Sequence, residues 1–331
     1  MRERVGRVFA LLDKVIEALP VHPNHRDLLR IYLGAGREEA EAWPEMSAIQ
    51  VPFLVHAAVA GDERPALPVA AACTFLSLGA DLYDSILDHE LPPFWHTRDS
   101  AEVNLTATTL MATLPQLSIA HLQRQGTPPA RLWALAHHFA DTLQLMIAGE
   151  YEDLLLPNLE RVSLEDSRAM VERKSGSAHA LFARAGAVLA TEYPLTIEAY
   201  ANFGLCFGIA KQLINDVWGI WGEHASRDLL NGKRTLPIVY ALSTLRGEQR
   251  TRLRKLLATA RESAEHHHEV RALLAAARSV RYTALIVSLY QQQARNHLVA
   301  ASPQGTAGEE LHMLLDRVSL LPQREKAPPS R

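Results

Sequence analysis

Two apolar stretches of this chain each end in oxygen-bearing side chains that share one helical face. The first stretch, ALPVAAACTFLSLGADLYDSILDHE, carries Asp81, Asp84 and Asp88 in its C-terminal half, spaced by three and four residues. That spacing places all three carboxylates on one side of a helix. A carboxylate among apolar residues needs a partner, and Mg²⁺ binds one or two carboxylates together with substrate phosphates. The pattern predicts that Asp84 and Asp88 bind Mg²⁺, while Asp81 extends the same face.

The second stretch, YANFGLCFGIAKQLINDVWGIWGE, repeats this arrangement. Its polar face carries Lys211, Asn215, Gly219 and Glu223, each four residues after the last. We predict Asn215 and Glu223 as metal ligands, with Asp216 one step off the face and able to reach the same ion or to orient a ligand. Two such helices predict a cavity that holds a metal–diphosphate cluster. Such a cluster ionises a substrate by stabilising the departing diphosphate.

Basic side chains should complete the diphosphate clamp. Arg173 and Lys174 lie in MVERKSGSAHALF, and Lys233 and Arg234 lie in LLNGKRTLP. A lysine binds phosphate as a point charge and an arginine binds it as a planar fork. These two segments are therefore the expected source of the positive charge.

The elements that position these residues are predicted to be helices. Apolar residues recur three and four apart with charged residues between them, and no strand with period-two alternation is visible. Pro and Gly mostly separate the periodic segments, and neither a fixed-period repeat nor a Gly/Ser-rich linker divides the chain. We predict one all-α domain over residues 1–322, a bundle of roughly twelve helices around a central cavity. Residues 323–331 are expected to form a disordered tail.

Composition excludes several classes of protein. The 331 residues are 48% apolar and 21% charged, which is typical of a globular chain. A formal net charge of −3 gives no reason to expect binding to nucleic acid. The two cysteines cannot build a disulfide framework. The N-terminus is not a signal peptide, and the longest apolar run, residues 67–80, is too short to span a bilayer. We expect a cytoplasmic protein without stable membrane insertion.

Five sequence blocks, in order between about residues 53 and 320, resemble those of the trans-isoprenyl diphosphate synthases and related class I terpene synthases. DSILD stands at the family's DDxxD motif, and GEYED resembles its GQxxD. The block KSG, which begins at Lys174, is similar to the family's KTG. The block KQLINDVWG resembles FQxxDDxxD, with Gln212 retained. GKRTLP resembles GKKTLP, with Lys233 at the diphosphate lysine.

The resemblance implies an isoprenoid synthase fold and an allylic prenyl diphosphate as substrate. It also implies Mg²⁺, as three ions when diphosphate is bound, and a homodimer. Lys174, Lys233, Arg173 and Gln212 are then expected at the diphosphate. In the family, bulky residues four and five positions before the first aspartate floor the pocket.

Four residues are expected to shape the cavity. The small Ala80 and Gly79 stand at those two flooring positions, which implies a deep pocket and a prenyl chain of about fifteen or twenty carbons. Tyr83 and Trp218 could stabilise a carbocation through their ring faces.

The departures from the family pattern set our expectation of activity. Ser85 replaces the second aspartate of the first motif, and Gly219 replaces the last aspartate of the second, which is then similar to the metal motif of terpene synthases. Elongating synthases bind isopentenyl diphosphate with a GKR block before the first motif and paired arginines after it. Here the first region reads EMSAIQVPF, and Arg98 stands alone in the second. We therefore expect a terpene cyclase, a lyase that quenches the carbocation without isopentenyl diphosphate.

Three alternatives remain open at this point. A prenyltransferase acting on a peptide or small molecule needs no isopentenyl pocket, as in the bacterial enzymes that modify the tryptophan of a competence pheromone, which the NDxxx…KRTLP pattern also resembles. An elongating synthase fits if other cationic residues replace the missing ones. A non-catalytic subunit of a heteromeric prenyl synthase would also show degenerate motifs.

Overall fold

The computed structural model describes residues 1–159, 161–222, 227–259 and 264–320, and over these ranges the chain is helical with no strand. The predicted all-α class is confirmed. The predicted tail, residues 323–331, lies outside the described residues. The α-helices are α1 (Arg2–Glu17), α2 (Pro23–Ala42), α3 (Ser47–Ala60), α4 (Leu67–Leu87), α5 (Ser100–Thr108), α6 (Leu114–Arg124), α7 (Pro129–Leu155), α8 (Leu164–Val171), α9 (Ser177–Ala190), α10 (Pro194–Trp221), α11 (Arg227–Leu230), α12 (Leu236–Thr244), α13 (Gly247–Thr259), α14 (Ala264–Ala276), α15 (Ser279–Ala301) and α16 (Gly305–Asp316). Two π-helical turns, η3 (Thr109–Thr113) and η5 (Glu172–Gly176), interrupt this series.

Proline marks the start of several long helices, consistent with its predicted place between the periodic segments. Pro23, Pro129 and Pro194 are the first residues of α2, α7 and α10. The position suits proline because its missing N–H would have no intrahelical partner there and its backbone angle is already helical. Pro52 is an exception and lies inside α3.

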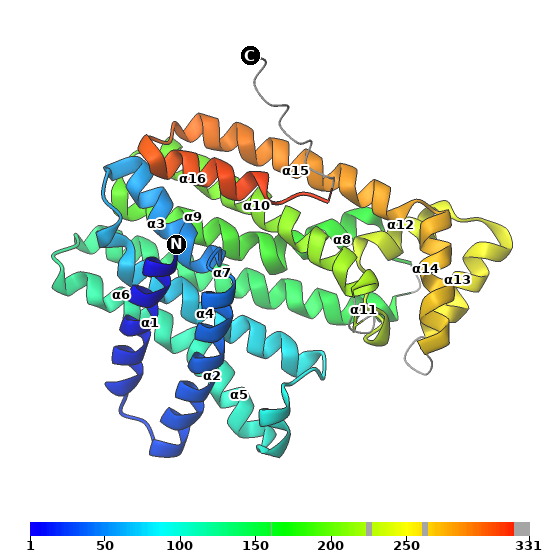
Figure 1. Cartoon of the computed structure of the whole chain (residues 1–331), viewed down its shortest axis with the longest axis horizontal. Coiled ribbons are helices and arrows are strands. Elements are labelled where there is room, and N and C mark those ends of the chain that lie inside the picture. The colour runs from blue at the N-terminus through cyan, green and yellow to red at the C-terminus, as the bar shows by residue number, and fades with distance from the viewer. Residues whose placement is uncertain (160, 223–226, 260–263, 321–331) are drawn as a thin grey trace, which may run out of the picture.

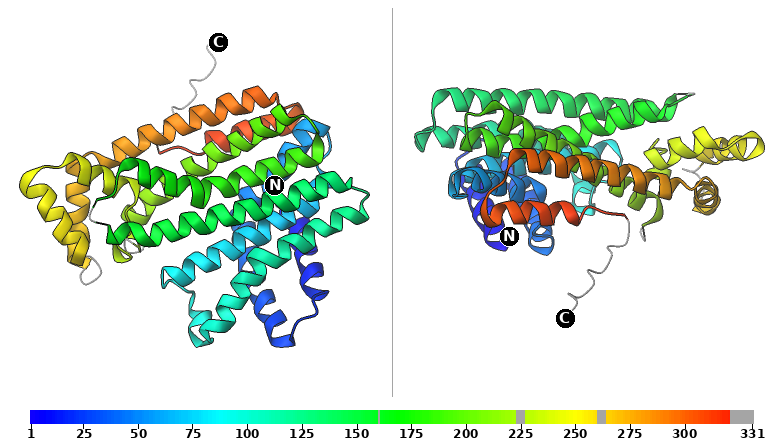
Figure 2. Two further views of the ribbon diagram at one scale, coloured as in Figure 1. Left: turned by 180° about the vertical axis from the view of Figure 1, so that it is seen from behind. Right: turned by 90° about the horizontal axis from the view of Figure 1, so that it is seen from above.

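The largest core cluster joins the helices at the centre of the bundle. Helix α10 packs along α9 and α15, α9 packs on α3 and α7, and α4 packs on α3 and α6. Figure 1 shows α15 and α16 along one edge of the bundle, and Figure 2 shows α7 and α9 running side by side on the opposite face. The long helices that carry the predicted motifs, α4 and α10, therefore both belong to the interior.

Two smaller clusters flank this centre. One packs α1, α2 and α5 on α4. The other joins α12, α13 and α14, which lie at the end of the molecule away from α1 (Figure 1). The functional motifs lie between these two flanking clusters.

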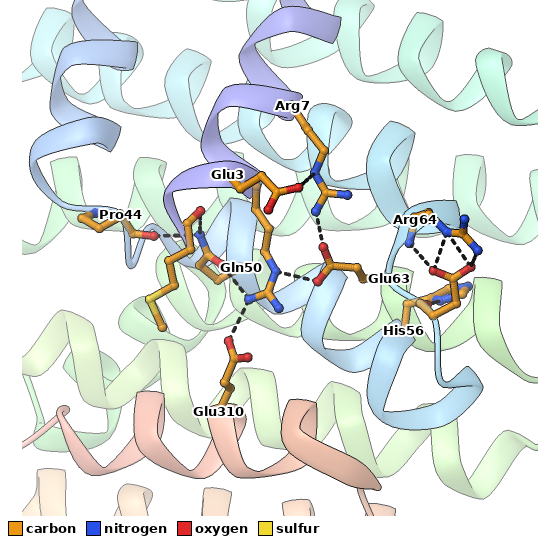
Figure 3. A network of polar contacts seen from close by, with 11 residues as sticks. Glu3, Arg7, Pro44, Gln50, His56, Glu63, Arg64 and Glu310 are labelled. Atoms are coloured by element: carbon orange, nitrogen blue, oxygen red, sulfur yellow. Dashed lines mark hydrogen bonds and ion pairs between the residues drawn. The ribbon is translucent and has the colours of Figure 1, made fainter.

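A polar network ties the N-terminal helix to the start of α3. Arg4 donates to Glu63 at 2.7 Å, to Gln50 at 3.1 Å and to Glu310 of α16 at 2.8 Å. Gln50 in turn donates to the Pro44 carbonyl at 2.7 Å, as Figure 3 shows. The segment between α2 and α3 is thereby held against the core.

Among the described residues, one helical segment, Arg64–Leu87, is by itself long and apolar enough to cross a membrane by length and composition. Its apolar window is 72% buried inside the fold. Core helices of this kind pass the same test, because both environments select apolar side chains.

Candidate active site

A cavity of about 560 Å³ opens between the α2–α3 connection, α4, α7, α9 and α10. Its apolar part is lined by Leu76, Ala80, Met111, Met146, Ala178 and Phe182. The polar residues Asp84, Glu150, Lys174, Gln212 and Asn215 gather on its wall, so that predicted residues from α4, α7, η5 and α10 meet at one place. An apolar pocket with a few convergent polar groups is the usual form of a small-molecule site.

Lys174 ties three of these elements together. Its Nζ lies 2.7 Å from Asp84 Oδ1, 2.9 Å from Glu150 Oε2 and 2.9 Å from Asp153 Oδ2. Burial alone would lower the pKa of Lys174, but the three carboxylates outweigh burial and hold that pKa well above its ordinary value. The ammonium group therefore stays charged and neutralises acids from α4 and α7.

The local backbone explains how Lys174 comes so close to α7. Gly149 precedes Glu150, and a Cβ at Gly149 would lie only 2.4 Å from the backbone nitrogen of Lys174. Lys174 itself lies in the π-helical turn η5, a distortion that is frequent at functional sites. A residue without a side chain and an irregular turn thus place the ammonium between the two carboxylate-bearing helices.

Lys233 contacts the carboxylate that follows α4, as Lys174 contacts the one within it. Its Nζ donates to Asp88, the residue that follows α4, and lies 3.9 Å from Asp153. Burial and the neighbouring Lys174 would lower the pKa of Lys233, but Asp84, Asp153 and Asp88 raise it above its ordinary value. Both lysines predicted to bind diphosphate therefore contact a carboxylate predicted to bind metal. Lys174 also pairs with Asp153, and Lys233 lies near the same residue.

Asp216 of α10 is held by a short polar chain. Ser175 Oγ donates to Gln212 Oε1 at 2.8 Å, and Gln212 Nε2 donates to Asp216 Oδ1 at 2.9 Å. Asp216 Oδ2 is buried without a hydrogen-bond partner, and burial raises the pKa of this carboxyl to about 6. Gln212 therefore orients Asp216, and the free oxygen is a ready ligand for a cation.

Asp228 of α11 joins the same group of acids. The place of a Cβ at Gly219 lies 2.4 Å from Asp228 Oδ2. Burial and the nearby Asp216 raise the pKa of Asp228 to about 8, although Lys233 opposes them. A carboxylate from a different helix thus occupies the space that a side chain at position 219 would take.

The structure does not bring every predicted residue to the cavity. Arg173 pairs with Glu152, with Nη2 2.8 Å from Oε1, and does not line the cavity. Trp218 is 63% exposed on the outer side of α10 and is also absent from the lining. Glu223 lies outside the described residues.

Of the two small residues before the first motif, one lines the cavity and the other does not. Ala80 and Tyr83 line the cavity. Gly79 does not line it, because this residue is buried against η3, where a Cβ would lie 2.6 Å from the backbone nitrogen of Met111. Gly79 therefore permits α4 and η3 to approach closely, and Ala80 forms part of the pocket wall.

Sequence reasoning missed Asp153, Glu150 and Asp228 as site residues. The GEYED block contains the first two, and their spacing of three on a helix was a usable signal. Asp228 follows the second motif by several residues in a polar segment, and nothing in that pattern places it over Gly219.

The residues fit Mg²⁺ as a ligand set, although among the described residues no group of three or more His, Cys, Asp or Glu side chains forms a ready cage. Lysines hold Asp84 and Asp88 instead, and Asp216 has an unpartnered buried oxygen. Mg²⁺ needs only one or two protein carboxylates when phosphate oxygens and water supply the rest. Hard carboxylate oxygens beside phosphate-binding lysines meet that requirement.

Comparison with known proteins identifies the family. The family model described as Polyprenyl synthetase matches residues 93–275, more than half of the chain, so this chain belongs to the polyprenyl synthetase family. It is 30% identical over 217 residues to a protein named geranylgeranyl diphosphate synthase from Mycobacterium tuberculosis. It is 24% identical over 252 residues to a protein of the same name from Methanosarcina mazei, covering 73% of this chain and 74% of that protein.

The match to the first of these relatives is partial, covering 61% of this chain and 60% of the Mycobacterium tuberculosis protein. Solved structures agree on the fold over nearly the whole chain. A polyprenyl synthetase from Streptomyces coelicolor superposes with a TM-score of 0.81 at 20% identity, covering 97% of this chain and 98% of that one. A geranylgeranyl pyrophosphate synthetase from Pyrococcus horikoshii gives 0.80 at 21% identity, covering 98% and 99%. The predicted isoprenoid synthase fold is therefore confirmed.

The expectation of a terpene cyclase, a lyase, is wrong. Curated relatives are named geranylgeranyl, farnesyl and geranylfarnesyl diphosphate synthases, which are prenyltransferases. The structure also weakens one argument for a cyclase, the missing aspartate at Gly219, because Asp228 places a carboxylate there.

Proposed function

We propose that this chain is a prenyltransferase that joins an allylic prenyl diphosphate to isopentenyl diphosphate and releases a longer prenyl diphosphate. The observation that carries the proposal is that Lys174 holds Asp84 on the wall of an apolar cavity, while Lys233 holds Asp88 and both lysines act electrostatically on Asp216. The names of the curated relatives support this reaction class, and geranylgeranyl diphosphate is the product we expect.

In this proposal the carboxylates hold Mg²⁺ and the lysines hold the allylic diphosphate. Asp84, Asp88 and Asp216 are the expected metal ligands, and of these Asp84 lines the cavity, as Asn215 does. Mg²⁺ bound there supplies positive charge that stabilises the departing diphosphate. Without metal, the ammonium of Lys174 neutralises the acids.

The lysines are the groups of the site suited to phosphate. If the acids held a metal, Lys174 and Lys233 would be available to phosphate oxygens, to which ammonium groups form strong charge-assisted hydrogen bonds. Gln212 keeps Asp216 oriented throughout, because it is itself fixed by Ser175.

The reaction breaks one bond and forms another inside the cavity. The allylic C–O bond to diphosphate breaks, the terminal alkene carbon of the acceptor forms a C–C bond with the prenyl carbon, and a proton leaves to restore a double bond. The apolar lining, with Leu76, Ala80, Met111 and Phe182, excludes water from the carbocation. The growing chain would extend along this lining past Ala80.

Product analysis tests the proposal directly. The protein is incubated with Mg²⁺ and geranyl or farnesyl diphosphate, with and without isopentenyl diphosphate, and the diphosphate products are separated by chain length. Longer diphosphates that form only with isopentenyl diphosphate support the proposal, and the double variant Asp84→Asn/Asp88→Asn should abolish them. Release of diphosphate without any longer product, or formation of hydrocarbon without the acceptor, would contradict it.

We also propose a homodimer, which the family resemblance implies. Helices α6 and α7 expose Leu117, Trp133 and Leu145, and apolar side chains of this size on helix surfaces are typical of subunit contacts. Sedimentation equilibrium should give twice the mass of 36.7 kDa. A Trp133→Glu variant should shift the equilibrium toward monomer, whereas a monomeric wild type would contradict the proposal.

A further inference from the structure

Helix α15 forms one outer edge of the bundle. It spans 23 residues, or about 35 Å. Figure 1 shows it along the edge, and in the right-hand view of Figure 2 no other helix covers its ribbon. The sequence of α15 contains no Asp or Glu. This edge of the molecule is therefore a long helix without negative charge of its own.

The outward side of α15 carries a row of exposed apolar side chains. Leu285 and Leu289 are 56% and 59% exposed, and Val299 near the C-terminal end is 63% exposed. Arg281, Leu285 and Leu289 are each four residues apart, so they lie on one side of the helix. Val287, between the two leucines, is buried on the other side. Exposed apolar residues that gather on one face are typical of a contact surface.

Positive charge gathers at the N-terminal end of the same helix. Arg278, directly before α15, and Arg281 in its first turn are both exposed. Among the residues that the structure describes, neither guanidinium group has a hydrogen-bond or ion-pair partner. Arg295, nearer the C-terminal end, is instead paired with Asp316 of α16 at 2.7 Å. The free cations of this surface therefore lie beside the two leucines.

The neighbouring pair of helices adds to this charge. Helix α14 packs on both α13 and α15 at the end of the molecule (Figure 1). Residues 246–281 contain nine Lys and Arg against four Asp and Glu, whereas the whole chain has 34 against 37. On α13, Arg254 and Lys255 are exposed, and Arg252 is paired with Glu269 of α14. This end of the molecule is thus basic in a chain that is acidic as a whole.

An anionic lipid bilayer suits both features of the surface. Negative headgroups attract the arginines, and the acyl region beneath them accepts the leucines, as for helices that lie in the plane of a membrane interface. A second copy of the chain suits it less well, because α15 has no acid to pair with the arginines of its partner. A nucleic acid would bind the arginines through phosphate and leave the leucines in water.

The proposed homodimer leaves this surface free. We assign its contact to α6 and α7, and Figure 2 shows α7 on the face opposite the edge formed by α15 and α16. No residue of α15 lines the large cavity. Contact with lipid through α15 is therefore compatible with both the dimer and an open active site.

We propose that α15 docks reversibly in the plane of an anionic lipid bilayer through Leu285, Leu289, Arg278 and Arg281. The inference goes beyond the proposed function and does not depend on it. A prenyl diphosphate is itself amphipathic, so docking would also place the enzyme beside the phase that takes up the product of the proposed reaction.

Vesicle sedimentation is the first test. The full-length protein is mixed with vesicles of phosphatidylcholine alone, or of equal parts phosphatidylcholine and phosphatidylglycerol, and the bound fraction is measured over a range of lipid concentrations. We expect binding to the anionic vesicles, weaker binding to the neutral vesicles, and a decrease with added salt, which screens the arginines. Absence of wild-type binding to the anionic vesicles would overturn the inference.

Two double variants separate the apolar and the charged contributions. Leu285→Ser/Leu289→Ser should weaken lipid affinity about 10-fold or more, because apolar area no longer leaves water on docking. Arg278→Gln/Arg281→Gln should weaken affinity for anionic vesicles about 10-fold or more and leave affinity for neutral vesicles unchanged. Wild-type affinity for anionic vesicles in either double variant would overturn the inference.

Matched controls remove similar groups from other surfaces. Leu105 of α5 is 62% exposed, and Arg2 of α1 is exposed. Leu105→Ser and Arg2→Gln should bind vesicles as wild type does, and a loss equal to that of the double variants would overturn the assignment to α15. All of these substitutions are at exposed positions, so thermal melts should show wild-type folding.

A fluorescent label reports contact at a single position without any loss of binding. Cys73 and Cys206 are buried, so a polarity-sensitive thiol dye attaches to the introduced thiol of Leu289→Cys. Anionic vesicles should shift its emission to shorter wavelength and leave the emission of labelled Leu105→Cys unchanged. Unshifted emission from labelled Leu289→Cys at saturating lipid would overturn the inference.

The competing occupants give different results. A mass in sedimentation equilibrium that falls in Leu285→Ser/Leu289→Ser would assign the surface to a second copy and overturn the inference. Binding to a DNA duplex that Arg278→Gln/Arg281→Gln abolishes, without binding to vesicles, would assign it to nucleic acid with the same consequence. Neither result bears on the proposed function, because the product analysis contains no lipid.

Discussion

The Asp228 carboxylate occupies the space of a side chain at Gly219, nine residues earlier in the chain. Its Oδ2 lies 2.4 Å from the place of a Cβ at Gly219, and the pKa of Asp228 is raised to about 8 by burial and by Asp216. An acid that the second motif lacks in sequence is therefore supplied from α11. We expect Asp228 to act with Asp216 when Mg²⁺ binds.

Gly219→Ala should displace this carboxylate and reduce activity without unfolding the protein. The added methyl group meets the flexible end of Asp228, so the side chain can move aside, and alanine favours a helix interior by about 0.5–1 kcal/mol over glycine. We expect apparent Mg²⁺ affinity to fall by about 10-fold or more, because ligand-orienting groups affect metal affinity on that scale. Calorimetric titration of Mg²⁺ with an unreactive allylic diphosphate analogue measures the change.

Gly34→Ala is the matched control. Gly34 lies in α2, where an added Cβ meets nothing within 4 Å. It should give the same gain in helix stability of about 0.5–1 kcal/mol with unchanged Mg²⁺ affinity. Equal Mg²⁺ affinity in Gly219→Ala and Gly34→Ala would show that Asp228 has no part in the metal site.

Removing the central lysine should destabilise the metal-free protein more than removing its neighbour. Lys174→Met leaves Asp84, Glu150 and Asp153 without their shared cation, and breaking a buried ion pair costs about 3–5 kcal/mol. Urea unfolding in EDTA should show this loss in the free energy of unfolding. Added Mg²⁺ should recover part of it, because the metal replaces the missing charge.

Arg173→Met provides the comparison at the adjacent position. The Arg173–Glu152 pair is partly exposed, with side chains 39% and 34% accessible, so solvent screens it. Such pairs contribute about 0–1 kcal/mol, and Mg²⁺ should not alter the effect. Similar losses in both variants would contradict the central role assigned to Lys174.

Local sequence signals predicted the helices. Proline marks the starts of α2, α7 and α10, because its fixed backbone angle and missing N–H are properties of a single residue. The i, i+4 spacing of Asp84 and Asp88 predicted a shared helix face, and both residues meet a predicted lysine.

Relations between helices were not predictable in the same way. Gly79 and Ala80 are equally small, and only the rotation of α4 against Met111 decides which of them meets the cavity. Trp218 lies on the outer face of α10 for a similar reason. The contact of Asp228 with Gly219 depends on the path of the chain between α10 and α12, which no periodicity encodes.

Asp216 should make the stability of the metal-free protein depend on pH. Its pKa in the folded protein is about 6, above the ordinary 3.8, because burial disfavours the charged form. The folded state then binds more protons than the unfolded state between these pH values, so the free energy of unfolding falls as pH rises through that window. A shift of about two units corresponds to about 2–3 kcal/mol.

Asp216→Asn should remove this dependence. It should match wild type near pH 4 and exceed it by about 2–3 kcal/mol above pH 6 when metal is absent. Urea unfolding in EDTA at pH 4, 5, 6 and 7 measures the difference, with the exposed Asp27→Asn as control. Saturating Mg²⁺ should reverse the order, because the ion binds the charged carboxylate of the wild type. A pH-independent difference would contradict the assignment of this slope to Asp216.

Product length should respond to Ala80 and not to Gly79. Ala80 lines the cavity, so Ala80→Phe places a ring in the path of the prenyl chain and should shorten the main diphosphate product by at least one five-carbon unit. Gly79→Ala instead meets the backbone of Met111, which cannot move aside as a side chain can. Overpacking of this kind costs about 1–3 kcal/mol. Gly79→Ala should therefore lower the melting temperature while the product length of the remaining folded enzyme stays that of wild type. Chromatography of the products and a thermal melt of each variant separate these outcomes, and a shortened product from Gly79→Ala would place the pocket floor one residue earlier than the structure does.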